Sequence, residues 1–225
     1  MLTVAIPTMT TLLLLAAVRL LPVVEKPATA AKAAPPYFAI LLTGDGGWRA
    51  VDAELTRELN RNGVSVAGLR SDDYFATART AEEVGGDVAQ LIETYGARWH
   101  RQQVILIGYS RGADALPIAL LHMPPALRQR VVLAALLAPS ASTELEIVPW
   151  WKLGRSAPSI ALAPLVRAIH GVRLMCVHGE DEDETLCDAL PKGAAVDVKT
   201  PGGHHFDRDY DELARIILAA AAKAP

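Results

Sequence analysis

One serine stands in a pattern that suits nucleophilic chemistry. The letters Gly108-Tyr109-Ser110-Arg111-Gly112 match G-x-S-x-G, between a strand-like apolar run and a helix-like segment. A serine nucleophile stands exposed on a sharp strand-to-helix turn, where flanking glycines remove side chains that would collide with the strained backbone. The positive end of the following helix then points at a developing oxyanion. The pattern predicts that Ser110 is a nucleophile; a turn whose serine only caps the helix is the alternative.

Two adjacent histidines follow the last predicted strand and precede the last predicted helix, in Gly203-His204-His205-Phe206. A general base must reach the serine hydroxyl, and a histidine in a loop at a strand end can do so. We expect His205 to be this base, because Phe206 would pack behind its imidazole, with His204 as the alternative. A surface loop with two solvated histidines is the non-catalytic interpretation.

An acidic run, Glu180 to Glu184, follows a strand-like segment and Gly179. The chain thus offers serine, acid and histidine in the order that α/β-hydrolases require. The third residue after the glycine, Glu182, is the usual acid position, and its carboxylate would hold the histidine tautomer and stabilise the protonated ring. Asp181 and Asp183 remain alternatives. A calcium loop is disfavoured because the run lacks the alternation and central glycine of an EF-hand.

A glycine-rich loop, Thr43 to Trp48, follows the first core strand and reads Thr-Gly-Asp-Gly-Gly-Trp. In α/β-hydrolases the oxyanion hole takes one N–H from the residue after the nucleophile, here Arg111, and one from such a loop, here at Asp45 and Gly46. Glycines would let the backbone approach the substrate carbonyl closely. A phosphate-binding loop is disfavoured because the Lys-Ser/Thr pair of a P-loop is absent.

These motifs lie between alternating strand-like and helix-like segments. Strands are expected at 37–43, 64–69, 103–108, 131–138, 172–178 and 194–200, and helices at 50–62, 80–99, 111–122 and 209–223. Continuous apolar strands that alternate with helices indicate a parallel sheet covered on both faces. We therefore expect an α/β fold, with the mostly parallel sheet of an α/β-hydrolase. The segment 139–164, with its two tryptophans, breaks the rhythm and is expected to cover the site or to be a surface excursion.

The composition is that of an ordinary globular protein, with 51% hydrophobic residues and a net charge of -3 over 225 residues. Nucleic-acid surfaces need clustered Lys and Arg, and the sequence has no basic run. We therefore expect no nucleic-acid partner. A serine triad needs neither a cofactor nor a metal ion, so none is expected.

The N-terminus is strongly apolar, but Arg19 and Pro22 shorten its apolar run to the length of a signal-peptide core. Small-residue cleavage sites follow, at 28–30 and 31–33. We expect residues 1–33 to be a signal peptide and linker, with residues 34–225 as the domain. The usual positive charge at the start is missing, so an uncleaved membrane anchor is the alternative. Export favours a disulfide between Cys176 and Cys187, since thiols pair in oxidising compartments.

Four ordered motifs resemble the bacterial virulence protein family VirJ/AcvB. They are Thr43 to Trp48, Asp73-Tyr74-Phe75, Gly108 to Asp114 and Gly203 to Asp207. The resemblance runs from about residue 37 to the C-terminus. It implies a periplasmic α/β-hydrolase that hydrolyses aminoacylated phosphatidylglycerol, notably the lysyl ester, with its serine at Ser110 and its histidine at His204 or His205. The chain departs from the family pattern at two positions. The family usually has Phe-Trp after the tyrosine of the Asp-Tyr-Phe motif, whereas here Ala76 follows Phe75, and the residue after the nucleophile is often phenylalanine, whereas here it is Arg111.

The expected function is therefore that of a periplasmic serine esterase acting on an aminoacylated phospholipid headgroup at a membrane surface. Two other functions remain open. One is a non-catalytic hydrolase-fold binding module that contacts the proteins of a secretion or virulence system, since a fold does not determine function. The other is a general esterase for small soluble molecules.

Overall fold

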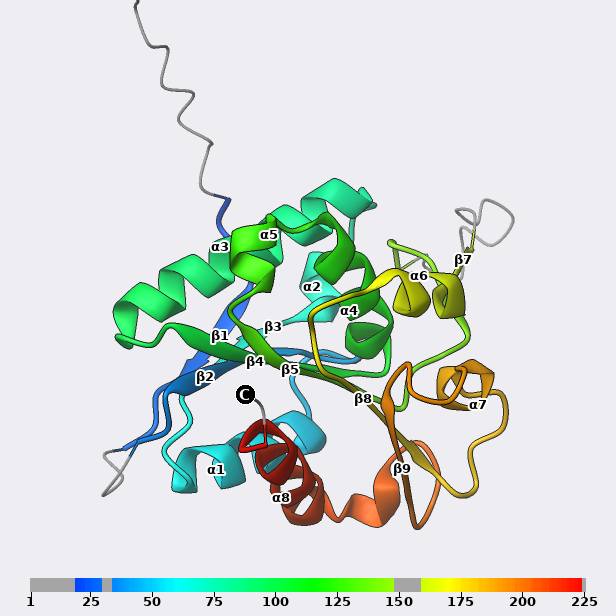
Figure 1. Cartoon of the computed structure of the whole chain (residues 1–225). Coiled ribbons are helices and arrows are strands. Elements are labelled where there is room, and N and C mark those ends of the chain that lie inside the picture. Colours follow the sequence, from blue (N-terminus) through cyan, green and yellow to red (C-terminus); the bar gives the residue numbers. More distant parts are fainter. Residues whose placement is uncertain (1–18, 30–33, 148–158, 224–225) are drawn as a thin grey trace, which may run out of the picture.

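A seven-stranded sheet lies at the centre of the computed structural model, which describes residues 19–29, 34–147 and 159–223 (Figure 1). Six strands are parallel, and the edge strand β1 alone runs antiparallel to its neighbour. In spatial order the strands are β1 (Val23–Lys26), β3 (Val66–Leu69), β2 (Tyr37–Leu42), β4 (Gln103–Tyr109), β5 (Val131–Leu137), β8 (Leu174–Gly179) and β9 (Val196–Thr200). The mostly parallel sheet predicted from the sequence is confirmed.

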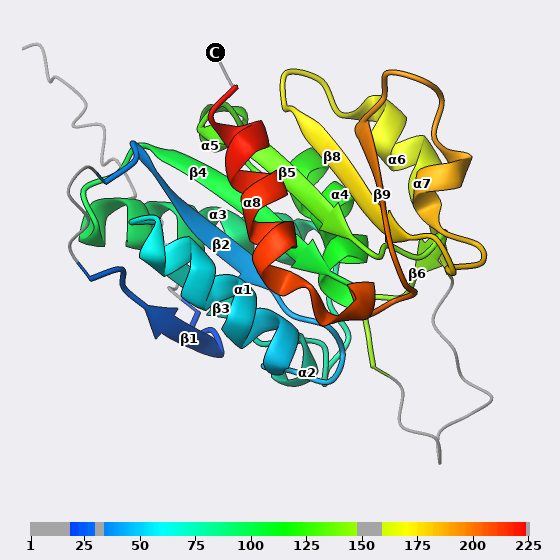
Figure 2. The same ribbon diagram turned by 90° about the horizontal axis from the view of Figure 1, so that it is seen from below.

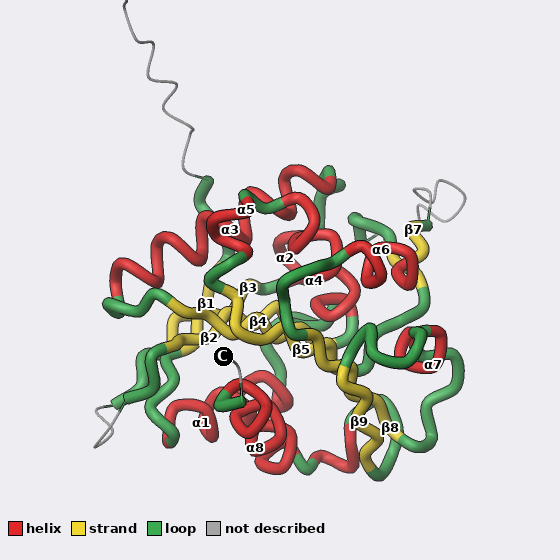
Figure 3. The backbone as a smooth tube through the Cα atoms, viewed as in Figure 1, coloured by secondary structure: helices red, strands yellow, loops and turns green. Residues whose placement is uncertain are grey.

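Helices cover both faces of this sheet, which Figure 3 shows roughly edge-on. One face carries α1 (Ala50–Arg61) and α8 (Tyr210–Ala221), which lie in front of the strands in Figure 2. The other carries α2 (Ser71–Tyr74), α3 (Ala81–Arg98), α4 (Arg111–His122), α5 (Pro125–Arg128), α6 (Leu162–Ala168) and α7 (Leu186–Ala189). Alternate residues of a strand point to opposite faces, so a sheet covered on both sides needs strands that are apolar throughout. In β2, for instance, Phe38 and Ile40 face one core and Ala39 and Leu41 the other.

The segment expected to be a signal peptide and linker, residues 1–33, contains a strand of the central sheet. Val23–Lys26 forms β1, which pairs with β3 from Val23 opposite Leu69 to Lys26 opposite Val66. A four-residue strand has no period that a sequence pattern can reveal, and only its partner strand makes it a strand. Part of the segment assigned to a leader and linker is therefore folded onto the sheet. The apolar stretch 1–18 and the second small-residue site fall in residues outside the described ranges.

Cys176 at the centre of β8 and Cys187 in α7 form a disulfide, with their Cα atoms 5.6 Å apart. The pairing expected from the sequence is confirmed. The irregular segment between β5 and β8 contributes a two-stranded ribbon, β6 (Ser142–Thr143) with β7 (Ile160–Ala161). Its tryptophans fall within 148–158, outside the described residues. None of the helices in the described ranges combines the length and the apolar character needed to cross a bilayer.

Candidate active site

Four loops that carry the predicted site residues leave the same edge of the sheet. Thr43 follows β2, Ser110 follows β4, Glu182 lies three residues after β8, and His204 lies four residues after β9. Because these strands are parallel, their carboxyl ends meet at one edge, which is where ligands bind in open α/β sheets. The topology alone therefore brings the predicted residues into one neighbourhood.

The serine occupies a strained turn between β4 and α4. The backbone of Ser110 has φ 52° and ψ −120°, a conformation that residues other than glycine rarely adopt and that occurs often at functional sites. A Cβ on Gly112 would lie 2.0 Å from the Leu42 carbonyl oxygen, and one on Gly108 would lie 2.4 Å from the Gly112 oxygen. Only glycine fits at these two positions, as the predicted nucleophile elbow requires.

A cavity of about 580 Å³ opens beside this turn. Ser110, His204 and His205 line it together with the glycine-rich loop at Asp45 and Gly46. The wall also carries charged side chains of both signs, namely Arg49, Asp52, Glu54 and Arg208. The cavity therefore offers room for a polar or charged group next to the serine.

Glu182 is hydrogen-bonded to His204, with Glu182 Oε1 2.8 Å from His204 Nδ1. Its other oxygen accepts the Gly179 N–H at 2.9 Å. Burial opposes the ionised carboxylate, but the hydrogen bonds from His204 and from the Gly179 amide lower the pKa of Glu182 below its ordinary value. The bond to Glu182 in turn raises the pKa of His204 above its ordinary value. With Nδ1 held by the carboxylate, Nε2 is the ring nitrogen left for another partner.

The histidine preferred from the sequence has a different neighbour. His205 Nδ1 lies 2.7 Å from the Tyr109 hydroxyl, and Phe206 is buried in the core against Tyr109. The expected pairing of Glu182 with His205 is therefore wrong, and His204, the alternative, takes that place. Neighbouring residues of a loop point in different directions, and the letters His204-His205 do not say which way either ring turns.

The other acids of the run lie away from the histidines. Glu180, Asp181, Asp183 and Glu184 are exposed, whereas Glu182 has a side chain only 12% accessible. In the described part of the chain, neither Asp181 nor Asp183 forms a hydrogen bond or ion pair with a histidine. The third position after Gly179, chosen from the sequence, is the one that meets an imidazole.

The glycine-rich loop lies against the serine turn. A Cβ on Gly44 would lie 3.3 Å from the Tyr109 ring and 3.6 Å from Ser110 Cβ. The Gly47 N–H closes the loop by donating to the Gly44 oxygen at 3.1 Å. Arg111, directly after the serine, is the first residue of α4, and N–H groups at this position have no acceptor within the helix. Its guanidinium donates to the Glu144 carbonyl oxygen at 2.8 Å and is not among the groups that line the cavity.

Two residues near the histidines escaped prediction. Tyr109 bonds His205 as described, and its hydroxyl also donates to the His204 carbonyl oxygen at 3.1 Å. Asp114 is buried in α4 and accepts the Ser140 N–H at 2.7 Å; burial raises its pKa to about 6. Tyr109 directly precedes the serine, and Asp114 lies four residues after it. Only the three-dimensional turn shows which side chains these two residues face.

One group of possible metal ligands occurs among the described residues, formed by His178, Cys187 and Asp197. The sulfur of Cys187 is bonded to Cys176, so it cannot act as a thiolate ligand. His178 and Asp197 alone are too few for a protein metal site.

Solved structures are similar to this chain over most of its length. Est1E of Butyrivibrio proteoclasticus, solved with ferulic acid bound, has a TM-score of 0.61 and 14% identity, covering 90% of this chain and 96% of its own. XC6422 of Xanthomonas campestris, an α/β serine hydrolase without a lid, gives 0.58 and 16%, covering 90% and 89%. The esterase domain of a Rhodothermus marinus protein gives 0.58 and 14%, covering 91% and 97%. The fold is that of the α/β-hydrolases.

No curated protein matches the sequence significantly. The family model described as bacterial virulence protein (VirJ) matches residues 36–224, which includes every residue of the candidate site. The resemblance noted from the four motifs is thereby confirmed. The chain belongs to the VirJ family of bacterial virulence proteins.

Proposed function

We propose that the protein is a serine esterase in which Ser110, His204 and Glu182 form the catalytic triad. The observation that carries the proposal is the 2.8 Å bond between Glu182 and His204, next to a serine on a strained elbow in the same cavity. An acid that orients a histidine beside an exposed serine is the arrangement by which acyl transfer is recognised on unrelated folds.

In this mechanism His204 Nε2 takes the proton of Ser110 Oγ as the oxygen attacks the ester carbonyl. The Glu182 carboxylate stabilises the imidazolium that forms, without itself accepting the proton. The amides of Arg111 and of the loop at Asp45 and Gly46 would hold the oxyanion. The alcohol leaves with the proton from the histidine, and water then releases the acyl group from the serine by the same route.

The proposed substrate is an aminoacyl ester of phosphatidylglycerol at the periplasmic face of a membrane. The cavity wall supports it, because Asp45 and Glu54 can attract an ammonium group, whereas Arg49 and Arg208 can attract a phosphate. The disulfide supports an oxidising compartment such as the periplasm. The Arg111 guanidinium keeps its charge but donates to the Glu144 carbonyl oxygen and does not line the cavity that would hold the lysyl group.

The test is hydrolysis of lysyl-phosphatidylglycerol in phosphatidylglycerol vesicles by the purified full chain, with release of free lysine as the readout. We expect release by the wild type and none by Ser110→Ala. Cleavage of soluble aryl esters without any release of lysine would favour a general esterase. A folded protein that cleaves neither substrate would favour the binding module that contacts secretion or virulence proteins.

A further inference from the structure

A short segment ahead of the family match is attached to the domain along its whole described length. This N-terminal strap, residues 19–29, contains β1, which covers the outer edge of β3 (Figure 2). Beyond the strand ladder, the Pro22 oxygen accepts the Arg70 N–H at 2.9 Å, and the Ala28 N–H donates to Ser65 Oγ at 3.0 Å. The family model begins at residue 36, so nothing in the family match accounts for this strap.

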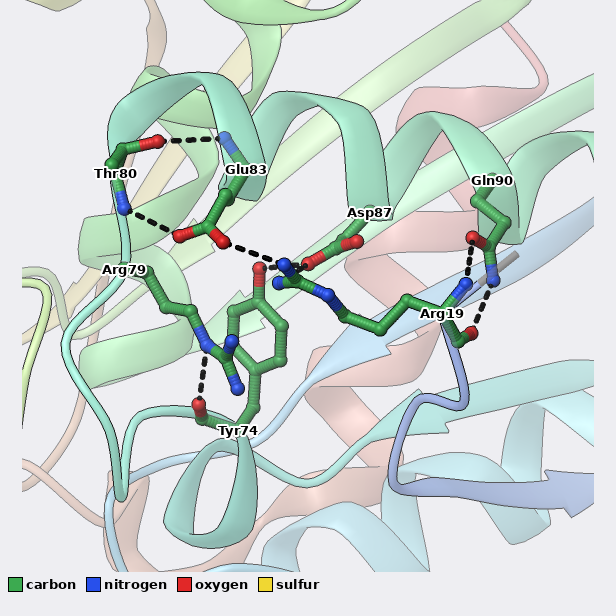
Figure 4. Close-up of polar contacts among 7 residues, drawn as sticks. All are labelled: Arg19, Tyr74, Arg79, Thr80, Glu83, Asp87 and Gln90. Carbon is green, nitrogen blue, oxygen red and sulfur yellow. Dashed lines mark hydrogen bonds and ion pairs between the residues drawn. The ribbon is translucent and has the colours of Figure 1, made fainter. Parts of the chain in front are cut away.

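Arg19 fastens the start of the strap to α3 (Figure 4). Its guanidinium contacts Glu83 Oε1 at 2.5 Å and Asp87 Oδ2 at 2.9 Å. The Gln90 side chain bonds both the N–H and the carbonyl oxygen of Arg19, at 3.1 and 2.7 Å. The same oxygen of Asp87 accepts the hydroxyl of Tyr74 at 2.7 Å, and Tyr74 is fully buried. A residue whose guanidinium meets two carboxylates and whose backbone is held by an amide side chain is attached more specifically than by an isolated surface ion pair.

These contacts hold both ends of α2. Pro22 bonds Arg70, the residue before the helix, while Arg19 acts through Asp87 on Tyr74, the last residue of the helix. Between these two attachments, Ser71 reaches back to the glycine-rich loop. Its N–H donates to Thr43 Oγ1 at 2.9 Å, and its hydroxyl donates to the Thr43 carbonyl oxygen at 2.6 Å.

A second contact from α2 reaches the same loop. A Cβ on Gly47 would lie 2.5 Å from the Asp72 carboxylate, so this side chain lies directly against the backbone of the loop. Arg70 holds the Asp72 carboxylate at 2.6 Å. The contacts therefore run without a gap from the strap, through α2, to the loop that faces Ser110.

We infer that the N-terminal strap is a positioning element of the active site, which braces the glycine-rich loop through α2. The inference rests on the proposed function for its catalytic consequence. The structural part of the inference, that the strap limits the motion of residues 43–48, is independent of the proposed function. It also follows that the working protein retains Arg19 to Lys26. A cut at either small-residue site within 28–33 would separate the strap from the domain.

The first test compares full-length variants at the strap. Arg19→Ala removes the attachment to α3, and Arg19→Lys keeps a positive charge there. Arg98→Ala is the matched control, because Arg98 joins the same strap to the same helix through Glu25 but, among the described residues, has no hydrogen bond or ion pair with α2. The readouts are amide exchange of residues 43–48 and 71–75, and the rate of labelling by a fluorophosphonate probe.

For Arg19→Ala we expect faster exchange in both segments and labelling slower by about fivefold, the size of a coupling between contacting groups. Arg19→Lys should restore part of both, and Arg98→Ala should stay close to wild type. If Arg19 acts on the loop through Ser71, the effects of the two substitutions are not additive, so the double variant Arg19→Ala/Ser71→Ala should label only slightly more slowly than Ser71→Ala alone. Unchanged exchange at 43–48 in folded Arg19→Ala protein would overturn the inference. If the wild type itself fails to label, the proposed function fails, while the exchange result still decides the role of the strap.

The second test is the N-terminal residue of the exported protein, read by intact mass after expression in a Gram-negative host with its own N-terminus. We expect the chain to begin at or before Arg19. A fully active protein that begins within 29–34 would overturn the inference.

Discussion

Two loops contribute to the candidate site from opposite sides of β4, and they are held in place by different physical means. The direct hydrogen bonds from α2 to the glycine-rich loop after β2 are neutral ones between Thr43 and the buried Ser71, and the ion pairs of Arg19 and Arg70 act on the loop only through α2. The acidic loop after β8 depends on the charged pair of Glu182 with His204, on a partly exposed surface, and on the disulfide that brackets it. Neutral bonds to backbone groups do not respond to pH, whereas an ion pair does. A change of pH should therefore disturb the acidic loop more than the glycine-rich loop.

The largest expected effect is the difference in labelling rate between variants of the two histidines. We expect His204→Ala to slow fluorophosphonate labelling by about 10³–10⁴-fold, because the general base is lost. His205→Ala removes a partner of Tyr109 and should cost about tenfold or less. Labelling rates of the two purified variants decide it, with circular dichroism to show that both are folded. A larger loss of labelling rate in His205→Ala than in His204→Ala would show that His205, the residue preferred from the sequence, is the general base.

The next effect concerns the charge of the acidic loop. His204 accepts a proton only when neutral, so labelling should accelerate as pH rises through its raised pKa. Glu182→Gln removes the main cause of that raised pKa, so the ascending limb should move to lower pH while the maximal rate falls about 10²–10⁴-fold. Asp183→Asn, at an exposed neighbour, is the control and should leave the pH profile in place. A pH–rate profile that is the same in Glu182→Gln and in the wild type would contradict the assignment.

Loss of the disulfide should cost stability. The bond joins Cys176 and Cys187, which are eleven positions apart with Glu182 between them, and a disulfide that closes so short a loop stabilises the fold by about 3 kcal/mol. We expect the double variant Cys176→Ala/Cys187→Ala to lower the free energy of unfolding in urea by about that amount. Reduction of the wild type should reproduce the loss, and it should leave the double variant unchanged.

The smallest effect probes the glycine-rich loop. Gly47 has φ +73°, and Gly193 has φ +87° with open space around it. Alanine at either position is strained and should cost about 1 kcal/mol in unfolding free energy. Only Gly47→Ala also collides with Asp72, so it alone should slow labelling, with a pH profile of wild-type shape. Equal labelling by both variants would show that the position of this loop does not matter.

The sequence predicts the features that have a local physical cause and misses those that depend on residues distant in the chain. Period and glycine positions identify the parallel strands and the elbow at Ser110, because each has a local physical cause. The position of Glu182 was also predictable, as the third residue after a strand-ending glycine. The choice between His204 and His205 was not, because two identical neighbours differ only in the direction that the loop gives them. The strap was missed for a related reason, since four residues become β1 only beside β3.

Covalent labelling by a fluorophosphonate probe tests most directly whether Ser110 is an activated nucleophile. The purified full-length protein should react at one site, identified by mass spectrometry as Ser110, and folded Ser110→Ala should not react. Absence of labelling in the folded wild type, or equal labelling in the variant, would show that Ser110 is not an activated nucleophile.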